Sequence, residues 1–181
     1  MLPEISLNVL DIAQNSIKAG ATLIEIRVGK KRAEEILTLS INDNGCGMDE
    51  KQVEQVIDPF FTSRSTRKIG LGVPFLKQAA EASGGSFRIT SEPGVGTQVF
   101  AEFHTGHIDC MPLGDINSTI FSLVTINEEL DFVYTYSVDQ KSFTLDTREI
   151  REILGNVSFQ NGEVASFLRE YLSENQSEVE Q

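Results

Sequence analysis

The order in which helix-like and strand-like patterns follow one another places the strongest constraint on the fold of this chain. Residues 3–19 carry the apolar side chains of Leu10, Ala13 and Ile17 at helical spacing and are followed by Gly20, a typical helix stop. Two strand-like runs come next, 21–28 and 36–42, joined by the charged turn 29–35. Further along, the sequence predicts a short helix at 49–57, a loop at 58–72, a helix at 73–83 and a hairpin of strands 86–91 and 97–103. This α-β-β-α-α-β-β order predicts a two-layer α/β sandwich with helices on one face of a mixed sheet.

A change in composition near residues 104–115 marks the start of a second segment. The pattern beyond it predicts a helix near 116–125, a hairpin over 130–146, and helices near 147–154 and 162–172. The polar, acidic tail 173–181 is predicted to fray. We therefore divide the chain into residues 1–106 and a small α+β appendage, 107–181, in which we identify no family motif.

The charge balance and composition exclude several classes of protein. A formal charge of −12 makes nucleic acid an unexpected partner, although a nucleotide held by local cations and backbone N–H groups is compatible with it. No apolar run reaches the roughly 18 residues of a membrane span, and the N-terminus lacks the basic start of a signal peptide. The chain has only 2 cysteines, in unrelated sequence contexts, which is typical of a protein from a reducing compartment. We therefore expect a cytoplasmic protein.

One polar stripe on the first predicted helix has the residue types of a metal–phosphate site. Asp11, Asn15 and Lys18 lie at i, i+4 and i+7, within roughly 60° of one another around the helix. An Asn oxygen suits a hard divalent cation, a Lys neutralises phosphate, and an Asp could orient water or the ion. A solvated face with an Asp–Asn–Lys ladder is the alternative reading of the same residues.

A glycine-rich turn interrupts the chain where the second predicted strand ends. A carboxylate at Asp43 could accept a hydrogen bond from an exocyclic amine such as that of adenine. Gly45 and Gly47 would let a flat ring pass close to the backbone. A simple surface turn explains the same pattern, so this motif is weak on its own.

A second glycine pair and a group of basic residues precede the helix at 73–83. Gly70 and Gly72 leave free backbone N–H groups at a helix start, where phosphate is the natural occupant. Arg64, Arg67 and Lys68 bring three cations into the preceding loop. A flexible loop with a solvated basic cluster is the alternative.

The remaining glycine motif, Gly94, Gly96 and Thr97, is a hairpin turn, and its local sequence does not show whether it also supports a ligand. The chain has neither the P-loop pattern G-x-x-x-x-G-K-[ST] nor G-x-G-x-x-G. A phosphate-binding loop here must therefore belong to another design.

Taken in order, these four stretches resemble the GHKL superfamily of ATP-binding domains, named for gyrase, heat-shock chaperones, histidine kinases and MutL. DIAQNSIKAGA resembles its asparagine box, DNGCGM its first glycine box and PFFTS its phenylalanine box. GLGVPFLKQAAEASGGSFRITSEPGVGTQVFAEF is similar to the second glycine box and final hairpin of histidine kinases. The resemblance covers about residues 7–103 and implies a Bergerat-type α/β sandwich that binds ATP between helices under a lid.

The resemblance also implies roles for individual residues. Asn15 would bind Mg²⁺, Lys18 would approach phosphate, and Asp43 would recognise the adenine amine. Gly45, Gly47 and Met48 would shape the adenine pocket. Residues 60–62, including Thr62, would open the lid. Gly70, Leu71 and Gly72 would wrap the phosphates, and Thr97 would support the adenine end.

Three departures from the family pattern bear on activity. Asp11 stands where the family usually has Glu, which leaves its role as general base open. Lys68 stands where histidine kinases have Gly, and it could contact phosphate, stiffen the lid or point to solvent. Because only a few residues precede the asparagine box, we expect no hairpin carrying a phosphoacceptor histidine, and we do not expect His104 or His107 to replace it. This leaves two readings: an ATP-binding module that resembles an anti-sigma-factor kinase in its compactness, or the catalytic domain of a histidine kinase whose substrate lies on another chain.

Two classes of function follow from the resemblance. In the first, Mg-ATP is bound and its γ-phosphate goes to a partner protein or to water near Asp11. In the second, the lid at 58–70 becomes ordered when ATP binds and changes a contact with another protein, without productive hydrolysis or transfer of phosphate. Residues 107–181 would bind a partner or a second copy of the chain, or would only buttress the sheet.

Overall fold

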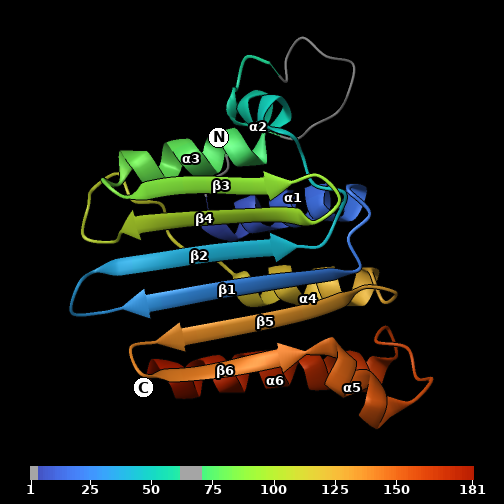
Figure 1. The fold of residues 1–181 in the computed structure, drawn as a ribbon. Helices are drawn as coiled ribbons and strands as arrows, with labels where there is room; N and C mark the ends of the chain where they lie inside the picture. The colour runs from blue at the N-terminus through green and yellow to red at the C-terminus, as the bar shows by residue number, and fades with distance from the viewer. Residues whose placement is uncertain (1–3, 62–70) are drawn as a thin grey trace.

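The computed structural model of the chain describes residues 4–61 and 71–181, which form a mixed six-stranded sheet with helices layered against it (Figure 1). The strands lie in the order β3-β4-β2-β1-β5-β6. Their bounds are β1 Leu23–Lys31, β2 Ile36–Asp43, β3 Ser86–Glu92, β4 Gly96–His104, β5 Asp131–Val138 and β6 Lys141–Asp146. The helices are α1 Ile5–Lys18, α2 Glu50–Ile57, α3 Gly72–Ala82, α4 Ile116–Ile126, α5 Thr147–Leu154 and α6 Gly162–Glu180. The predicted α/β sandwich is confirmed.

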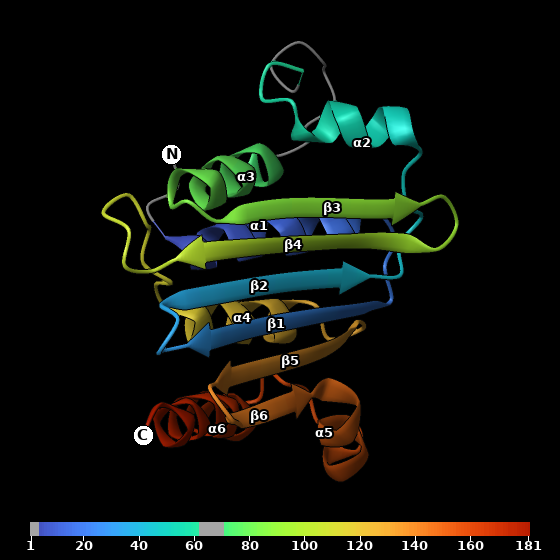
Figure 2. The same ribbon diagram turned by 60° about the vertical axis from the view of Figure 1, so that its left-hand side comes forward.

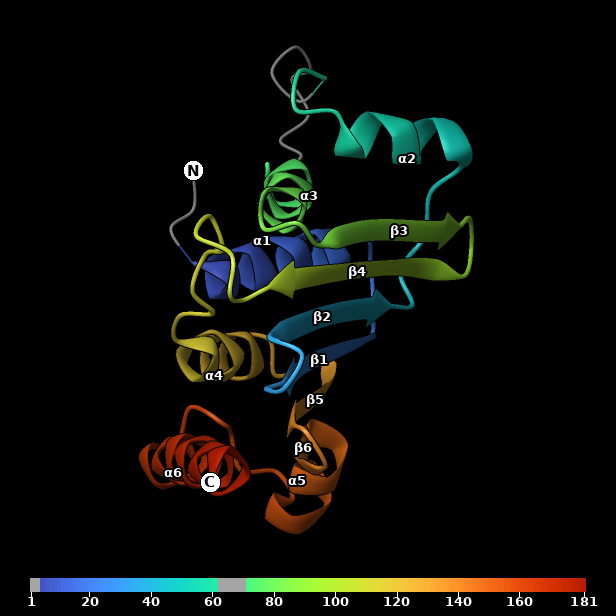
Figure 3. The same ribbon diagram turned by 90° about the vertical axis from the view of Figure 1, so that its left-hand side faces the viewer.

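Helices α1, α4 and α6 lie on one side of the sheet, and α3 lies beside α1 near the β3 edge (Figure 3). Buried and more exposed side chains alternate along β1 and β2, because successive side chains of a strand point to opposite faces of the sheet. One face of the sheet is therefore apolar and is covered by the helices. Ile24, Ile26 and Val28 of β1 are buried, and Leu39 and Ile41 of β2 lie opposite Val28 and Ile26 in the antiparallel register. The apolar core therefore fills the space between this face and the helices.

Helix α1 packs on the sheet through Ile5, Val9, Ile12 and Ala13, which are almost fully buried. The sequence interpretation placed Leu10, Ala13 and Ile17 on the apolar side, but Leu10 and Ile17 are only partly buried at its borders. The apolar stripe of α1 is wider than that trio and centres on Val9 and Ile12, because residues at i, i+3 and i+4 share one face. The helix ends as predicted, with Gly20 at φ +77°.

The C-terminal segment extends the same sheet. Strand β5 pairs in parallel with β1, from Leu23 opposite Asp131 to Lys30 opposite Val138, and β6 pairs antiparallel with β5. Since β2 is antiparallel to both β1 and β4, β4 and β5 run in the same direction, and α4 lies in the crossover between them. The division at residue 106 thus crosses a continuous sheet, and the division of the chain into two domains stays a prediction.

The prediction of a frayed tail is wrong. Helix α6 runs almost to the C-terminus (Figure 2) and ends at Glu180. Val179 in its last turn is buried. The reason is a set of long-range contacts at the helix end: Lys30 Nζ lies 2.7 Å from Glu180 Oε1, and the Tyr136 hydroxyl donates a hydrogen bond to the same carboxylate. Arg32 donates to the Glu180 carbonyl. A polar tail can be ordered when partners distant in sequence bind its charges.

Burial by itself would raise the pKa of Glu180, but the hydrogen bonds from Lys30 and Tyr136 outweigh it and lower the pKa to about 2. The same contacts raise the pKa of Lys30 against the opposing effect of burial. Both groups are therefore charged over the physiological pH range. No helix in the described ranges combines the length and apolar character needed to cross a bilayer.

We predict that Glu180→Gln lowers the free energy of unfolding at pH 7 by about 1–2 kcal/mol, a figure reduced for solvent screening. The folded pKa of about 2 lies below the ordinary 4.5. The stabilisation should therefore be present above pH 4.5 and be lost as the pH falls towards 2. Urea unfolding across this pH range measures the difference, with the exposed neighbour Glu178→Gln as control. A pH-independent difference between the two variants would contradict the assignment.

Candidate functional site

A cavity of about 370 Å³ lies between α1, the end of β2 and the starts of α3 and β4. Six residues named from the sequence line it together: Asn15, Lys18, Asp43, Gly47, Met48 and Thr97. They come from one helix, one strand end, one turn and one hairpin, so the fold brings distant stretches of the chain to a single site. Their individual roles toward a ligand stay predictions.

The carboxylate of Asp43 is held in place at the end of β2. Ser16 Oγ donates a hydrogen bond to Asp43 Oδ2 at 2.6 Å, and the backbone N–H of Gly45 donates to Oδ1 at 2.9 Å. A carboxylate has about four acceptor positions, so two donors leave capacity for a further N–H group. Asp43 is therefore an oriented acceptor facing the cavity.

Sequence reasoning missed Ser16, which fixes Asp43. It is buried on α1, and its partner lies 27 residues away, so no local pattern pairs them. Sequence reasoning also missed the apolar walls of the cavity. These are formed by Ile12, Ile41, Val56, Val73, Ile89 and Val99. Three of them lie on helices and three on strands, and only the fold shows that they border one cavity. Such walls suit the faces of a flat ring.

The first glycine turn is docked against the β3–β4 turn. Gly47 has φ +68°, and a Cβ there would lie 1.9 Å from the carbonyl oxygen of Glu92. Gly94 N–H donates to the Cys46 carbonyl at 2.7 Å, and Ser91 Oγ accepts from Met48 N–H at 2.8 Å. The hairpin motif thus supports the loop at 44–48 directly, a role that its local sequence did not show.

Asp11, Leu71 and Gly72 lie beside the cavity and do not line it. A Cβ at Gly72 would come within 2.7 Å of Asp11 Cβ, so Asp11 sits against the first turn of α3. Leu71 precedes α3 and is 40% exposed. The other predicted lid and phosphate residues, Thr62, Arg64, Arg67, Lys68 and Gly70, lie outside the described residues.

Asn15 is the residue best placed to hold a cation. A cation would be held by the Oδ1 atom of Asn15, while the Nδ2 atom, buried without a hydrogen-bond partner among the described residues, could donate to an oxygen of the same ligand. Within residues 4–61 and 71–181, no three His, Cys, Asp or Glu residues form a metal cluster. Mg²⁺ often uses only one or two protein ligands together with phosphate oxygens and water. Asn15 as a single protein ligand fits that mode, in which a phosphate compound and water supply the remaining ligands.

Comparison with known proteins identifies the family. Residues 3–107 match the sequence model described as Histidine kinase-, DNA gyrase B-, and HSP90-like ATPase. The chain belongs to this family. The resemblance deduced from the motifs is therefore confirmed, and the family match includes every element of the cavity.

Two relatives in this ATPase family are bacterial sensor kinases. The signal transduction histidine-protein kinase AtoS of Escherichia coli (strain K12) is 33% identical over 97 residues, covering 53% of this chain and 15% of that protein. The sensor histidine kinase WalK of Bacillus subtilis (strain 168) is 36% identical over 101 residues, covering 50% of this chain and 16% of that protein. The chain thus spans less than a fifth of the length of these relatives.

The fold also resembles the Aquifex aeolicus MutL ATPase domain complexed with ADP. The TM-score is 0.51 at 17% identity, and the match covers 85% of this chain and 70% of that chain. Such coverage exceeds what residues 3–107 alone could supply. The structural likeness to the ATPase fold therefore reaches into the C-terminal segment.

We predict that Gly47→Ala destabilises the protein more than Gly94→Ala. Both residues have left-handed φ angles, +68° and +78°, but a Cβ at Gly94 meets nothing within 4 Å. Gly94→Ala should cost about 1 kcal/mol of backbone strain, and Gly47→Ala about 1–3 kcal/mol more, because the Glu92 backbone must move. Urea unfolding of both variants tests this. Equal losses would show that the close approach to Glu92 is unimportant.

Proposed function

We propose that the chain binds Mg-ATP in this cavity and transfers the γ-phosphate to a partner protein, which makes it a kinase acting in trans. The observation that carries the proposal is the convergence of Asn15, Lys18, Asp43 and Thr97 on one cavity in a member of an ATPase family. Relatives named as sensor kinases support phosphotransfer, and a similar fold solved with ADP supports the nucleotide. A cytoplasmic role in signal transduction is part of the same proposal.

Different residues of the cavity bind the adenine and the phosphates of ATP. Asp43, fixed by Ser16 and Gly45, accepts a hydrogen bond from the adenine amine, while the apolar walls cover the ring faces. Asn15 and Lys18 lie further along α1 and face the phosphates, Asn15 as the Mg²⁺ ligand and Lys18 as a countercharge. When bound, Mg²⁺ neutralises phosphate charge and orients the β- and γ-phosphates.

Phosphotransfer breaks the bond between the γ-phosphorus and the bridging β–γ oxygen and forms a bond to the nucleophile of the partner. ADP leaves with the bridging oxygen, and the proton of the nucleophile goes to a base. Asp11 is the base that the family pattern offers, with a shorter side chain than the usual Glu. The residues 107–181 that extend the sheet provide a surface for the partner protein or for a second copy of the chain.

One observation favours a second function, an ATP-gated binding switch or slow ATPase. Asp11 packs against Gly72 at the start of α3 and does not line the cavity. A carboxylate that contacts α3 and not the cavity is better placed to couple nucleotide binding to the position of α3 than to act as a base.

Incubation with γ-labelled ATP and Mg²⁺, with and without co-purifying proteins, separates these functions. We expect label on a partner protein. Release of free phosphate alone would identify an ATPase. The absence of both at saturating ATP would identify the switch and contradict phosphotransfer.

We predict that Asp43→Asn weakens ATP binding by roughly 10- to 100-fold, because an acceptor held toward the adenine amine is replaced by an amide. Isothermal titration calorimetry with Mg-ATP measures the effect. The control is the exposed Asp109→Asn, which lies outside the cavity and should bind like the parent chain. Unchanged affinity in Asp43→Asn would remove Asp43 from adenine recognition.

We predict that Asn15→Ala reduces the dependence of ATP affinity on Mg²⁺. The variant should bind ATP in EDTA about as well as the parent chain does, and the gain in affinity on adding Mg²⁺ should fall at least roughly tenfold. Titrations with and without the cation measure both values. If the gain persists in full, Asn15 is not a metal ligand.

A further inference from the structure

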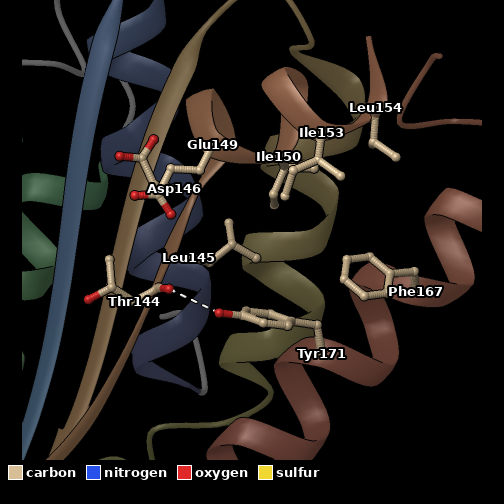
Figure 4. A pocket seen from close by; sticks show the side chains of 9 residues that line it. All are labelled: Thr144, Leu145, Asp146, Glu149, Ile150, Ile153, Leu154, Phe167 and Tyr171. Carbon is tan, nitrogen blue, oxygen red and sulfur yellow. Dashed lines mark hydrogen bonds between the residues drawn. The ribbon is translucent and has the colours of Figure 1, made fainter.

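A second hollow of about 310 Å³ lies at the outer edge of the sheet, between β6, α5 and α6 (Figure 4). It is far from the candidate nucleotide cavity, because β6 is at one edge of the sheet and β3 is at the other (Figure 1). Its apolar lining consists of Leu145, Ile150, Ile153, Leu154, Phe167 and Tyr171. We call this hollow the edge groove.

The core uses the apolar face of α5 only in part: Ile150 and Leu154 are partly buried against it, and Ile153 is left exposed. The only buried residue of α5 is Thr147, whereas Ile153 is 83% exposed and Phe167 across the groove is 51% exposed. Polar contacts also hold the helix: the Asp146 side chain caps it, and Arg151 pairs with Asp131. Large apolar side chains gathered around a hollow are typical of a binding surface.

The opposite wall of the groove is fixed in place. The rings of Phe167 and Tyr171 lie with centroids 5.9 Å apart, and Arg169 stacks over Phe121 of α4 at 4.2 Å. Tyr171 also donates a hydrogen bond from its hydroxyl to the Thr144 carbonyl at 3.1 Å. Since this bond uses an acceptor of the edge strand β6, the groove favours insertion of side chains over addition of a strand.

Charge identifies the kind of occupant. The two charged residues that line the groove, Asp146 and Glu149, are both acidic. Asp146 is paired with Arg148 at 2.8 Å, but the Glu149 side chain has no ion pair or hydrogen bond to any described residue. Residues 141–181 contain eight acidic and four basic residues. A second copy would bring the same acidic surface, whereas a basic partner would complement it.

We propose that the edge groove binds an amphipathic segment of a partner protein, with a large apolar side chain in the hollow and a Lys or Arg beside Glu149. The apolar side chain is held by Ile150, Ile153 and Phe167, and the cation selects the partner. Because the groove shares no residue with the nucleotide cavity, this inference stands independently of ATP binding and catalysis.

Selection from a random peptide library against the full chain tests the proposal. The enriched peptides should combine a large apolar residue with Lys or Arg within one helical turn. Fluorescence anisotropy of a labelled selected peptide should show at least roughly tenfold weaker binding to Ile153→Glu. Glu149→Gln should weaken it about three- to tenfold, and more at low salt than at high salt. Circular dichroism checks that each variant is folded.

Glu152→Gln is the matched control, because Glu152 is exposed on the same helix but does not line the groove, and it should bind like the parent chain. Failure to enrich any peptide, enrichment without basic residues, or equal loss in Glu149→Gln and Glu152→Gln would overturn the proposal. So would a concentration-dependent dimer in sedimentation that Ile153→Glu dissociates, since it would make a second copy the occupant. Measuring Mg-ATP affinity in the same variants keeps this outcome separate from failure of the nucleotide proposal.

Discussion

Strand β1 is the element on which the rest of the structure depends. It pairs with β2 on one side and with β5 on the other, and its inward residues Ile24, Ile26 and Val28 are almost completely buried. Through β2 it supports the strand end that carries Asp43, and through β5 it holds the C-terminal segment. The backbone hydrogen bonds of β1 are therefore shared by both parts of the chain.

The candidate site exists because glycines let backbone segments approach one another where side chains would collide. Gly47 lies against Glu92, Gly96 lies against the Asp43 carbonyl, and Gly72 lies against Asp11. Each contact joins a motif to a different part of the chain. The sequence motifs therefore contact one another in the folded chain. A shift of one glycine turn would also move the backbone segment that it contacts. The contact between Asp11 and Gly72 is one of these contacts, and it connects α1 with the start of α3.

Most of the fold could be predicted from the sequence because the signals are local. Apolar alternation in 21–28 and 36–42 indicates strands, and helical spacing with a glycine stop indicates α1. The cavity residues could be predicted only as a set, from the order of four motifs, because each motif alone can also be explained as a turn, a loop or a solvated face. The bond between Ser16 and Asp43 and the parallel pairing of β5 with β1 could not be predicted, since both join residues far apart in sequence. The ordered end of α6 was missed for the same reason: its composition predicts fraying, and its ion pairs with Lys30 and Arg32 oppose it.

The parallel pairing of β1 with β5 has a consequence for biosynthesis. Leu23 pairs with Asp131, so one side of β1 stays unpaired until more than 100 further residues have left the ribosome. During that interval the nascent chain presents an unpaired edge of β1, which carries the apolar residues Ile24 and Ile26. Strands of other chains can pair with such an edge. Premature termination upstream of β5 would leave this edge permanently uncovered. Self-association of such fragments, and their capture by chaperones, follow from the topology itself.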